Sequence, residues 1–290
     1  MKESWRHEFV NVDGLRMHYV TQGTGKLAIL LHGFPDFWYV WRFQIPELAK
    51  HFRVVAPDLR GYNKTDKPGG AENYRLNSLA GDVLGLIKAL NETRAIIIGH
   101  DWGGVIAWSF AAFNPEYTEK LVVLNAPHPN AYTNRTKDSF RQLQKSWYVF
   151  FFQIPCIPEE VLSRNDYSFL KSMVKLSFMN KEVLTDEDLK LHVEAWSQPG
   201  ALTAMMNYYR MNMNPSILFS ERTITFPRIT MPTLVIWGEQ DVALSKNLIK
   251  NIEEFVDAPY SIEYVPNCGH WVQLEQPTLV NKIIDEFLER

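Results

Sequence analysis

The sequence is poor in cysteine, has no long hydrophobic run and carries no excess of positive charge. Its 2 cysteines, Cys156 and Cys268, are far apart and lack the spacing of a metal site, so we expect free thiols in a reducing compartment. The longest aromatic run, 147–154, is interrupted by Gln153 and is far too short to span a bilayer. A formal net charge of −3 gives no basic field that would attract nucleic acid or an anionic membrane.

Targeting signals and metal motifs are also missing. The first residues, MKESWRHEF, lack the apolar segment of a secretory signal, and we therefore expect a cytoplasmic protein without a membrane span. His100 and His128 have no HxxxH or paired-carboxylate partners at metal-binding spacing, so no metal and no cofactor is predicted. The sequence leaves a monomer and a homodimer open. Its aromatic content of 13% suggests a pocket for an apolar ligand.

Short apolar runs alternate with segments of helical periodicity. Two initial strands, 8–12 and 15–20, flank the turn Asp13-Gly14. Further strands are expected at 27–31, 52–56, 95–98, 121–124, 233–237 and 261–265. Helices are expected at 40–50, 78–90, 102–113, 245–255 and 278–288, with Ser78 as the N-cap of the second. This order predicts an α/β fold, with a mostly parallel central sheet and helices on both faces.

The alternation stops in one long stretch. From 126 to 226 no clear strand appears, and the segment is rich in aromatic residues, methionine and helical periodicity. We therefore predict a core made of 1–125 and 227–290, with a helical cap, 126–226, inserted after the sixth strand. Ligands of such sheets bind at the carboxyl ends of the strands, and the cap is expected to cover that edge.

The segment GHDWGG (99–104) carries the central motif. It follows an apolar strand and opens a helix, and glycines stand two residues before and two residues after Asp101. A nucleophile elbow needs small residues at these positions because the turn from strand to helix is very sharp. The usual elbow holds serine, whereas this one holds Asp101. The alternative is a helix N-cap aspartate in a glycine-rich turn.

Candidates for the remaining triad follow in the order that such hydrolases use, which is nucleophile, acid and histidine. Asp241 comes just after the strand TLVIWG, with Glu239 as a nearby competitor. His270 lies in the loop after the last strand. The alternative acid position, after the sixth strand, holds Asn125 and no carboxylate, which favours Asp241.

The loop HGFP (32–35) is a candidate for the oxyanion hole. In this type of hydrolase, one backbone N–H comes from that loop and the other from the residue after the nucleophile. The donors are therefore expected to be the amides of Phe34 and Trp102. The alternative is an ordinary turn that ends a strand.

An aspartate nucleophile restricts the chemistry. Attack on an amide or ester would form a high-energy anhydride, whereas attack on a saturated carbon displaces a leaving group and forms an alkyl ester of the enzyme. His270, oriented by Asp241, would then activate the water that hydrolyses the ester of Asp101. The oxyanion hole would serve this second step.

These motifs resemble one known family. HGFPDFWYVWR (32–42), GHDWGG (99–104), WGEQD (237–241) and NCGHW (267–271) are similar to segments of the epoxide hydrolases of the α/β-hydrolase superfamily. The resemblance covers nearly the whole chain. It implies the α/β-hydrolase fold, a small apolar epoxide as substrate and water as co-substrate. The same aspartate branch also contains haloalkane and haloacetate dehalogenases.

The leaving group separates these activities, because an epoxide leaves as an alkoxide and needs a proton donor. Epoxide hydrolases use two tyrosines of the cap for this purpose. WYVFFFQIP (147–155) resembles the first tyrosine segment and matches Tyr148. NYYRMN (207–212) resembles the second and matches Tyr209, with Tyr208 one residue away as the alternative. Both could instead be aromatic residues of the cap's own core.

A dehalogenase-like hydrolase is the main alternative. The indole of Trp102 could bind a halide, but epoxide hydrolases share this residue. Haloalkane dehalogenases often have Asn at the position of Phe34, and haloacetate dehalogenases have Arg after the nucleophile and His at the position of Tyr148. Those residues are absent, which favours an epoxide hydrolase. A non-catalytic binding protein on this fold would be expected to have lost a triad or oxyanion-hole residue, and none is missing.

Overall fold

The computed structural model describes residues 5–136, 139–219 and 225–290. Its sheet has 8 strands in the order β1-β2-β4-β3-β5-β6-β7-β8. β1 pairs with β2 and β2 with β4 in antiparallel orientation, and the other neighbours are parallel. The strands are β1 (Arg6–Val12), β2 (Leu15–Gln22), β3 (Leu27–Leu31), β4 (Arg53–Pro57), β5 (Ala95–His100), β6 (Thr118–Leu124), β7 (Thr233–Gly238) and β8 (Tyr260–Val265). The mostly parallel sheet predicted from the sequence is therefore confirmed.

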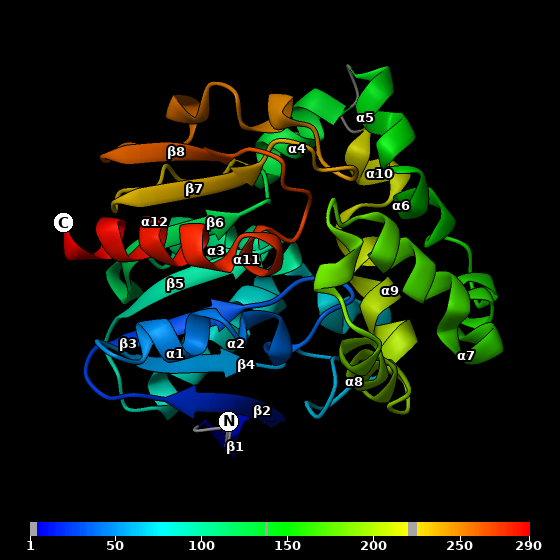
Figure 1. The fold of residues 1–290 in the computed structure, drawn as a ribbon, viewed down its shortest axis with the longest axis horizontal. Coiled ribbons are helices and arrows are strands. Elements are labelled where there is room, and N and C mark those ends of the chain that lie inside the picture. The colour runs from blue at the N-terminus through cyan, green and yellow to red at the C-terminus, as the bar shows by residue number, and fades with distance from the viewer. Residues whose placement is uncertain (1–4, 137–138, 220–224) are drawn as a thin grey trace.

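Helices cover both faces of the sheet, as predicted. The core helices are α1 (Gln44–Leu48), α2 (Leu76–Ala89), α3 (Trp102–Phe113), α11 (Val272–Glu275) and α12 (Pro277–Glu289). α1 contacts α12 and α2 contacts α3, and Figure 1 shows the first pair in front of the sheet and the second behind it. Every residue of β3 and β5 is buried, because both faces of these strands are covered.

A group of helices is inserted between β6 and β7. It consists of α4 (Pro129–Thr136), α5 (Phe140–Lys145), α6 (Trp147–Phe151), α7 (Ile157–Leu176), α8 (Asp186–Trp196), α9 (Ala201–Asn212) and α10 (Pro215–Leu218). Figure 1 shows α6 to α9 beyond the strand ends toward which the arrowheads of β4 and β7 point. The boundaries of the cap, 126–226, stay a prediction, and its residues 137–138 and 220–224 lie outside the described part.

Short 3-10 helices complete the chain and replace some of the predicted helices. They are η1 (Trp38–Trp41), η2 (Ala71–Tyr74), η3 (Pro115–Tyr117), η4 (Lys181–Val183), η5 (Lys246–Ile249) and η6 (Ile252–Glu254). The single helix expected at 40–50 is wrong, because η1 and α1 occupy that stretch. A continuous helix over this stretch would need a hydrogen bond from the backbone N–H of residue 46 to the carbonyl of residue 42, and Pro46 has no N–H. Among the described residues, no helix is long and apolar enough to cross a membrane.

Two other helix predictions differ from the structure. α2 begins at Leu76, so Ser78 lies inside the helix and is not its N-cap. The N–H of Leu76 instead donates to Oδ1 of Asn212 in α9, at 2.8 Å. A partner distant in sequence thus replaces the local cap. The helix expected at 245–255 is wrong as well, because Asn251 has a left-handed backbone (φ 50°) and separates η5 from η6.

Candidate active site

Asp101 stands at a sharp turn between β5 and α3. Its backbone has φ 51° and ψ −122°, a left-handed conformation that costs a non-glycine residue about 1–3 kcal/mol. Hydrogen bonds on both sides hold it there. Its N–H donates to the carbonyl of Leu124 at 3.3 Å, and its own carbonyl accepts from the N–H of Val105 at 2.9 Å. The turn therefore presents the Asp101 side chain at the end of the sheet, as the elbow motif predicts.

The glycines around the turn are required by close backbone approach. A Cβ atom at Gly99 would collide with the carbonyl of Gly103. A Cβ atom at Gly103 would collide with the carbonyls of Leu31 and His32. Side chains at these positions would push α3 away from the sheet, so the two glycines permit the turn that exposes Asp101.

The two predicted oxyanion-hole amides differ in their contacts. The N–H of Phe34 donates to Oδ1 of Asp101 at 2.7 Å. Trp102 is the first residue of α3, so its N–H has no acceptor within the helix. In the described part of the chain this N–H makes no hydrogen bond to Asp101. The N–H of Phe34 therefore already holds the carboxylate of Asp101, whereas the N–H of Trp102 only follows Asp101 in the sequence.

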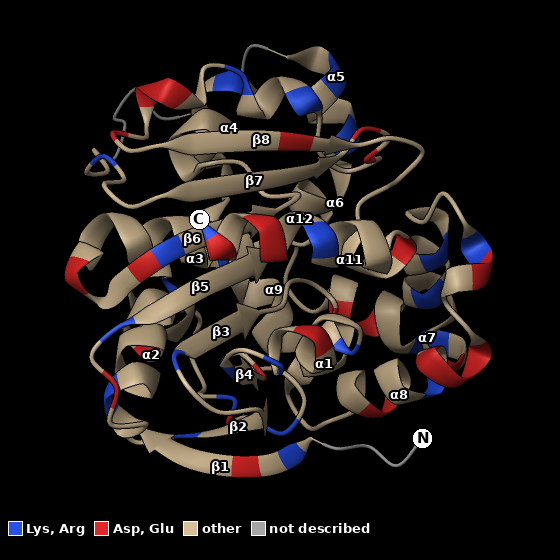
Figure 2. Cartoon of the chain, turned by 60° about the vertical axis from the view of Figure 1, so that its left-hand side comes forward, with Lys and Arg blue, Asp and Glu red and all other residues tan. Residues whose placement is uncertain are grey.

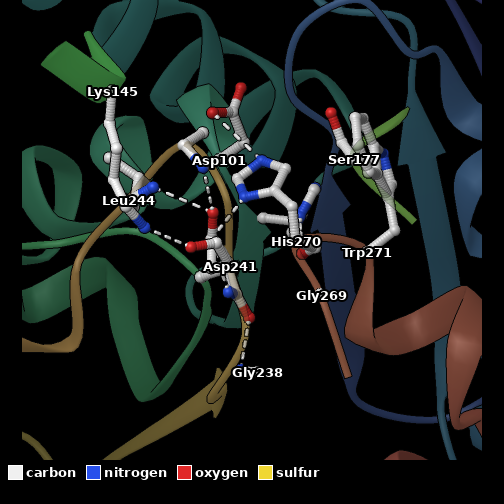
Figure 3. A network of polar contacts seen from close by, with 12 residues as sticks. Asp101, Lys145, Ser177, Gly238, Asp241, Leu244, Gly269, His270 and Trp271 are labelled. Atoms are coloured by element: carbon white, nitrogen blue, oxygen red, sulfur yellow. Dashed lines mark hydrogen bonds and ion pairs between the residues drawn. The ribbon is translucent and has the colours of Figure 1, made fainter. Parts of the chain in front are cut away.

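His270 lies between two carboxylates (Figure 3). Its Nδ1 is 2.7 Å from Oδ2 of Asp241, and its Nε2 is 3.5 Å from Oδ2 of Asp101. Asp241 is 4% exposed and also accepts the backbone N–H groups of Ala243 and Leu244, at 2.7 and 2.8 Å. The structure thus brings together the three side chains that the sequence proposes as a triad.

The competing acid, Glu239, has a different environment. Its carboxylate is 3.4 Å from the ammonium of Lys246, and both side chains are exposed at more than a third of their surface. Asn125, by contrast, stands in the sequence only as the absence of an acid. It follows β6 directly, and its side-chain NH₂ donates to Asp241 at 2.7 Å. Its own amide oxygen accepts the N–H of Gly238 at 3.0 Å. Asn125 directly follows a predicted strand, as Asp101 follows another, and this position is the signal in the sequence that could have pointed to a role at the site.

The charges of Asp241 and His270 affect each other. Burial alone would raise the pKa of Asp241, but the charge of His270 and hydrogen bonds from His270, Leu244 and Asn125 lower it. Burial alone would lower the pKa of His270, but the charge of Asp241 and hydrogen bonds to Asp101 and Asp241 raise it to about 10. His270 therefore favours the protonated form at neutral pH.

Two tyrosines from different cap helices face Asp101 across a cavity. Tyr148 comes from α6 and Tyr209 from α9, and their ring centroids are 5.8 Å apart. Two adjoining lobes, of about 60 and 270 Å³, are both lined by Asp101, Tyr148 and Tyr209. Tyr208 points elsewhere, because its hydroxyl donates to the carbonyl of Arg60 at 2.8 Å. Of the two adjacent tyrosines, Tyr209 is therefore the one at the cavity.

Both cavity tyrosines hold their protons firmly. Burial is the main cause that raises the pKa of Tyr209 well above its usual range, and the negative charge of Asp101 is the second. For Tyr148, burial is again the main cause, with Tyr132 and Asp101 acting in the same direction. Each hydroxyl is thus a neutral hydrogen-bond donor at physiological pH.

The wall of the cavity is mainly apolar. The larger lobe is also lined by Phe34, Pro35, Lys145, Trp147, Leu170, Met173, Val174, Leu176, Ser177, Val242, Ala243, His270 and Trp271. The smaller lobe is also lined by Leu76, Trp102, Val105, Ala126, Pro127, Pro129, Tyr132, Thr133, Asn212, Met213 and Leu244. Within the ranges that the structure covers, no group of three or more His, Cys, Asp and Glu side chains could hold a metal ion.

A buried polar network connects the cap to the loop that carries Phe34. Asp36 is 2% exposed, and its Oδ1 is 3.0 Å from Nε2 of His192 in α8. Its Oδ2 accepts the indole N–H of Trp271 at 2.6 Å. The indole of Trp196, also in α8, donates to the carbonyl of Pro35 at 2.6 Å. Sequence reasoning missed this network, because its members lie on three separate segments.

Sequence comparison identifies related proteins over almost the full length. A family model described as the alpha/beta hydrolase fold matches residues 27–158. The AB hydrolase superfamily protein YfhM of Bacillus subtilis (strain 168) is 43% identical, and the match covers 97% of each chain. Epoxide hydrolase 4 of Homo sapiens is 41% identical, and the match covers 98% of this chain and 79% of the human protein.

The fold comparison gives a concordant result. A crystal structure of the epoxide hydrolase of Bacillus megaterium, in complex with an inhibitor, superimposes with a TM-score of 0.91 at 33% sequence identity. The superposition covers 98% of this chain and 100% of the other. An epoxide hydrolase of an endophytic Streptomyces superimposes with a TM-score of 0.85 at 27% identity, covering 99% of this chain and 96% of the other.

Proposed function

Because this chain belongs to the epoxide hydrolases of the α/β-hydrolase fold, we propose that it converts epoxides to vicinal diols through a covalent ester on Asp101. The observation that carries this proposal is the cavity itself. A carboxylate at a nucleophile elbow and two protonated tyrosines line the same space. An attacking group and acids for the leaving oxygen are thus present together.

In the first step, Asp101 attacks a carbon of the epoxide. The N–H of Phe34 holds Oδ1, so Oδ2 forms the new C–O bond and Oδ1 becomes the carbonyl oxygen of the ester. The C–O bond of the ring breaks, and the electron pair goes to the epoxide oxygen. Tyr148 and Tyr209 donate hydrogen bonds to that oxygen, and one proton converts it to a hydroxyl.

In the second step, water hydrolyses the ester. Esterification removes the negative charge of Asp101, which is one of the groups that raise the pKa of His270. The imidazolium therefore gives up its proton more readily, to the tyrosine that lost one in the first step, and the neutral imidazole can then accept a proton from water. Hydroxide attacks the ester carbon, and the amides of Phe34 and Trp102 stabilise the resulting oxyanion. When the intermediate collapses, its C–O bond to the substrate breaks and the departing alkoxide takes the proton of the new carboxyl group. The diol is thereby released, and Asp101 is again a carboxylate.

The cap has a separate role in this proposal. We assign residues 126–226 to the cap, which supplies both acids and excludes bulk water, and 1–125 with 227–290 to the core, which supplies Asp101, Asp241 and His270. A small apolar epoxide suits the lining of the cavity, which is mostly aliphatic and aromatic. Halide release would need N–H donors and no acid, so the paired tyrosines favour the epoxide over the haloalkane.

Oxygen labelling tests the covalent mechanism. In a single turnover with excess enzyme in ¹⁸O water, styrene oxide should give a largely unlabelled diol, and the peptide that contains Asp101 should gain the label. Direct attack by a water molecule that Asp101 merely deprotonates predicts the reverse, a labelled diol and an unlabelled peptide. Faster hydrolysis of a bromoalkane of similar size than of styrene oxide would instead overturn the choice of substrate. The variant Asp101→Ala is the control for background hydrolysis.

A further inference from the structure

A cap segment that follows α7 packs directly against the loop of His270. The carbonyl of Ser177 lies so close to Gly269 that a Cβ atom on this glycine would collide with it (Figure 3). Next in the segment, the ring of Phe178 stacks on the indole of Trp271, with centroids 4.9 Å apart and planes at 3°. Gly269 and Trp271 are the residues before and after His270. The cap therefore contacts both sequence neighbours of the proposed base.

Glu275 joins these two segments. It is the last residue of α11, and Figure 2 shows this helix on the side of the core that faces α7. Its Oε1 accepts the backbone N–H of Gly269 at 2.9 Å. Its Oε2 accepts the backbone N–H groups of Met179 and Asn180, at 2.8 and 3.2 Å. One carboxylate therefore holds the loop of His270 with one oxygen and the cap with the other.

The bridge requires a carboxylate. Burial is the main cause that raises the pKa of Glu275, whereas the hydrogen bonds from the three N–H groups and the charge of His270 act in the opposite direction. An ionised carboxylate has two acceptor oxygens and no donor. An amide of the same size has one acceptor oxygen and an NH₂ group, so it could serve the loop or the cap, but not both.

The place of the bridge points to one step of the reaction. His270 is needed where water hydrolyses the ester, and a small displacement of such a group slows a reaction steeply. The acids of the first step, Tyr148 and Tyr209, lie on α6 and α9, away from the segment that Glu275 binds. We infer that Glu275 is a positioning residue that ties the loop of His270 to the cap, so that hydrolysis of the ester, and not its formation, requires the cap to be seated on this loop.

This inference rests on the proposed function, and the nearly isosteric variant Glu275→Gln tests it. Hydrolysis of the alkyl-enzyme should slow by about tenfold or more, because one side of the bridge is lost. Formation of the ester from styrene oxide should stay close to the wild-type rate. Single-turnover kinetics with separate detection of ester and diol would give the ratio of the two rates. Glu275→Leu, which removes both acceptors, should change this ratio at least as much.

A matched control separates the bridge from a general effect of losing a carboxylate. Glu119→Gln is the same change at a half-buried glutamate near the start of β6, 2.6 Å from the ammonium of Lys26, and it should leave the ratio unchanged. If Glu275→Gln slows both steps by the same factor, or slows neither, the inference is wrong. If the wild-type protein forms no alkyl-enzyme, it is the proposed function that fails.

Hydrogen exchange covers the case in which the variants of Glu275 fold poorly. Phe178→Leu keeps an apolar side chain in the cap but removes the stack on Trp271. Mass spectrometry should show faster backbone exchange in the peptide that contains Gly269, whereas the peptide of β5 should exchange as in the wild-type protein. The same variant should slow hydrolysis of the ester more than its formation. Unchanged exchange at Gly269 would contradict a link between the cap and the loop of the base.

Discussion

Asn125 and His270 donate to the same oxygen atom, Oδ2 of Asp241, and both distances are 2.7 Å. The other oxygen of that carboxylate accepts the N–H groups of Ala243 and Leu244. Both oxygens are thus fixed in place, and the carboxylate stays ionised. Nδ1 of His270 is held by this carboxylate, which leaves Nε2 as the nitrogen that faces Asp101. The orientation of the proposed base therefore depends on an amide as well as on the acid.

The variant Asn125→Ala tests this dependence. Removing one hydrogen bond to a buried charge costs about 1.5–3 kcal/mol, so hydrolysis of the alkyl-enzyme should slow by about tenfold or more. Formation of the ester should change less, because the nucleophile and the tyrosines are untouched. Single-turnover kinetics with separate detection of ester and diol would measure both steps. Equal slowing of the two steps would mean that Asn125 supports the fold of the site in general.

His270→Gln should stop the reaction after its first step. The base acts in ester hydrolysis and not in attack, so the variant should react once with an epoxide and accumulate the alkyl-enzyme. Steady-state turnover should fall by at least about a hundredfold. Intact-protein mass spectrometry should show the added mass of one substrate. A variant that never becomes alkylated would mean that His270 is required before the ester forms.

Replacing Tyr148 and Tyr209 together by Phe should slow ester formation by about a hundredfold or more, because the epoxide oxygen then lacks its proton donors. Tyr208→Phe is the matched control, since its hydroxyl contacts Arg60 and not the cavity. Stopped-flow tryptophan fluorescence and circular dichroism would report alkylation and folding. Near-normal turnover of the double variant, or an equal loss in the control, would contradict the assignment of the acids.

The charge of His270 also predicts a pH dependence of stability. Its pKa in the folded protein, about 10, is above the ordinary value of 6.5, so the folded state binds the proton more tightly than the unfolded state. This contribution is fully present below about pH 6.5 and is lost as the pH rises through about 10. The Tm advantage of the wild-type protein over His270→Gln should therefore be largest near pH 6 and should shrink toward pH 10. Calorimetry of both proteins across this range would show it, and a difference independent of pH would disprove it.

The sequence predicted those parts of the structure that depend on local pattern. The buried strands are continuous apolar runs, and Gly99 is required by its close approach to the carbonyl of Gly103, four residues later. The start of α2 could not be predicted in the same way, because the acceptor for the N–H of Leu76 is Asn212, 136 residues later. Asn251 interrupts the helix expected at 245–255 with a left-handed backbone. Asparagine adopts this conformation more readily than most residues, but it also occurs within helices, so the residue type alone does not mark the break.

The active-site residues show the same division. Asp101, Asp241 and His270 could be proposed because each follows a strand, and strand ends converge at one edge of a parallel sheet. The role of Asn125 could not, since an amide at that position reads as the absence of an acid. Sequence similarity matches the second acid to Tyr209 but leaves Tyr208, one residue away, open as the alternative. The choice depends on the direction in which each side chain leaves α9. Asp36, His192 and Trp271 meet through tertiary packing alone.

The contacts between cap and core restrict how such an enzyme can acquire new substrates. A graft that exchanges 126–226 for the cap of another hydrolase would take His192 away from Asp36, and Asn212 away from the first turn of α2. The loop that carries Phe34 would then lose a support although no residue of the core had changed. A successful chimera must therefore place an imidazole next to Asp36 and an amide at the first turn of α2. The core thus restricts which residues an exchanged cap can carry at these two positions.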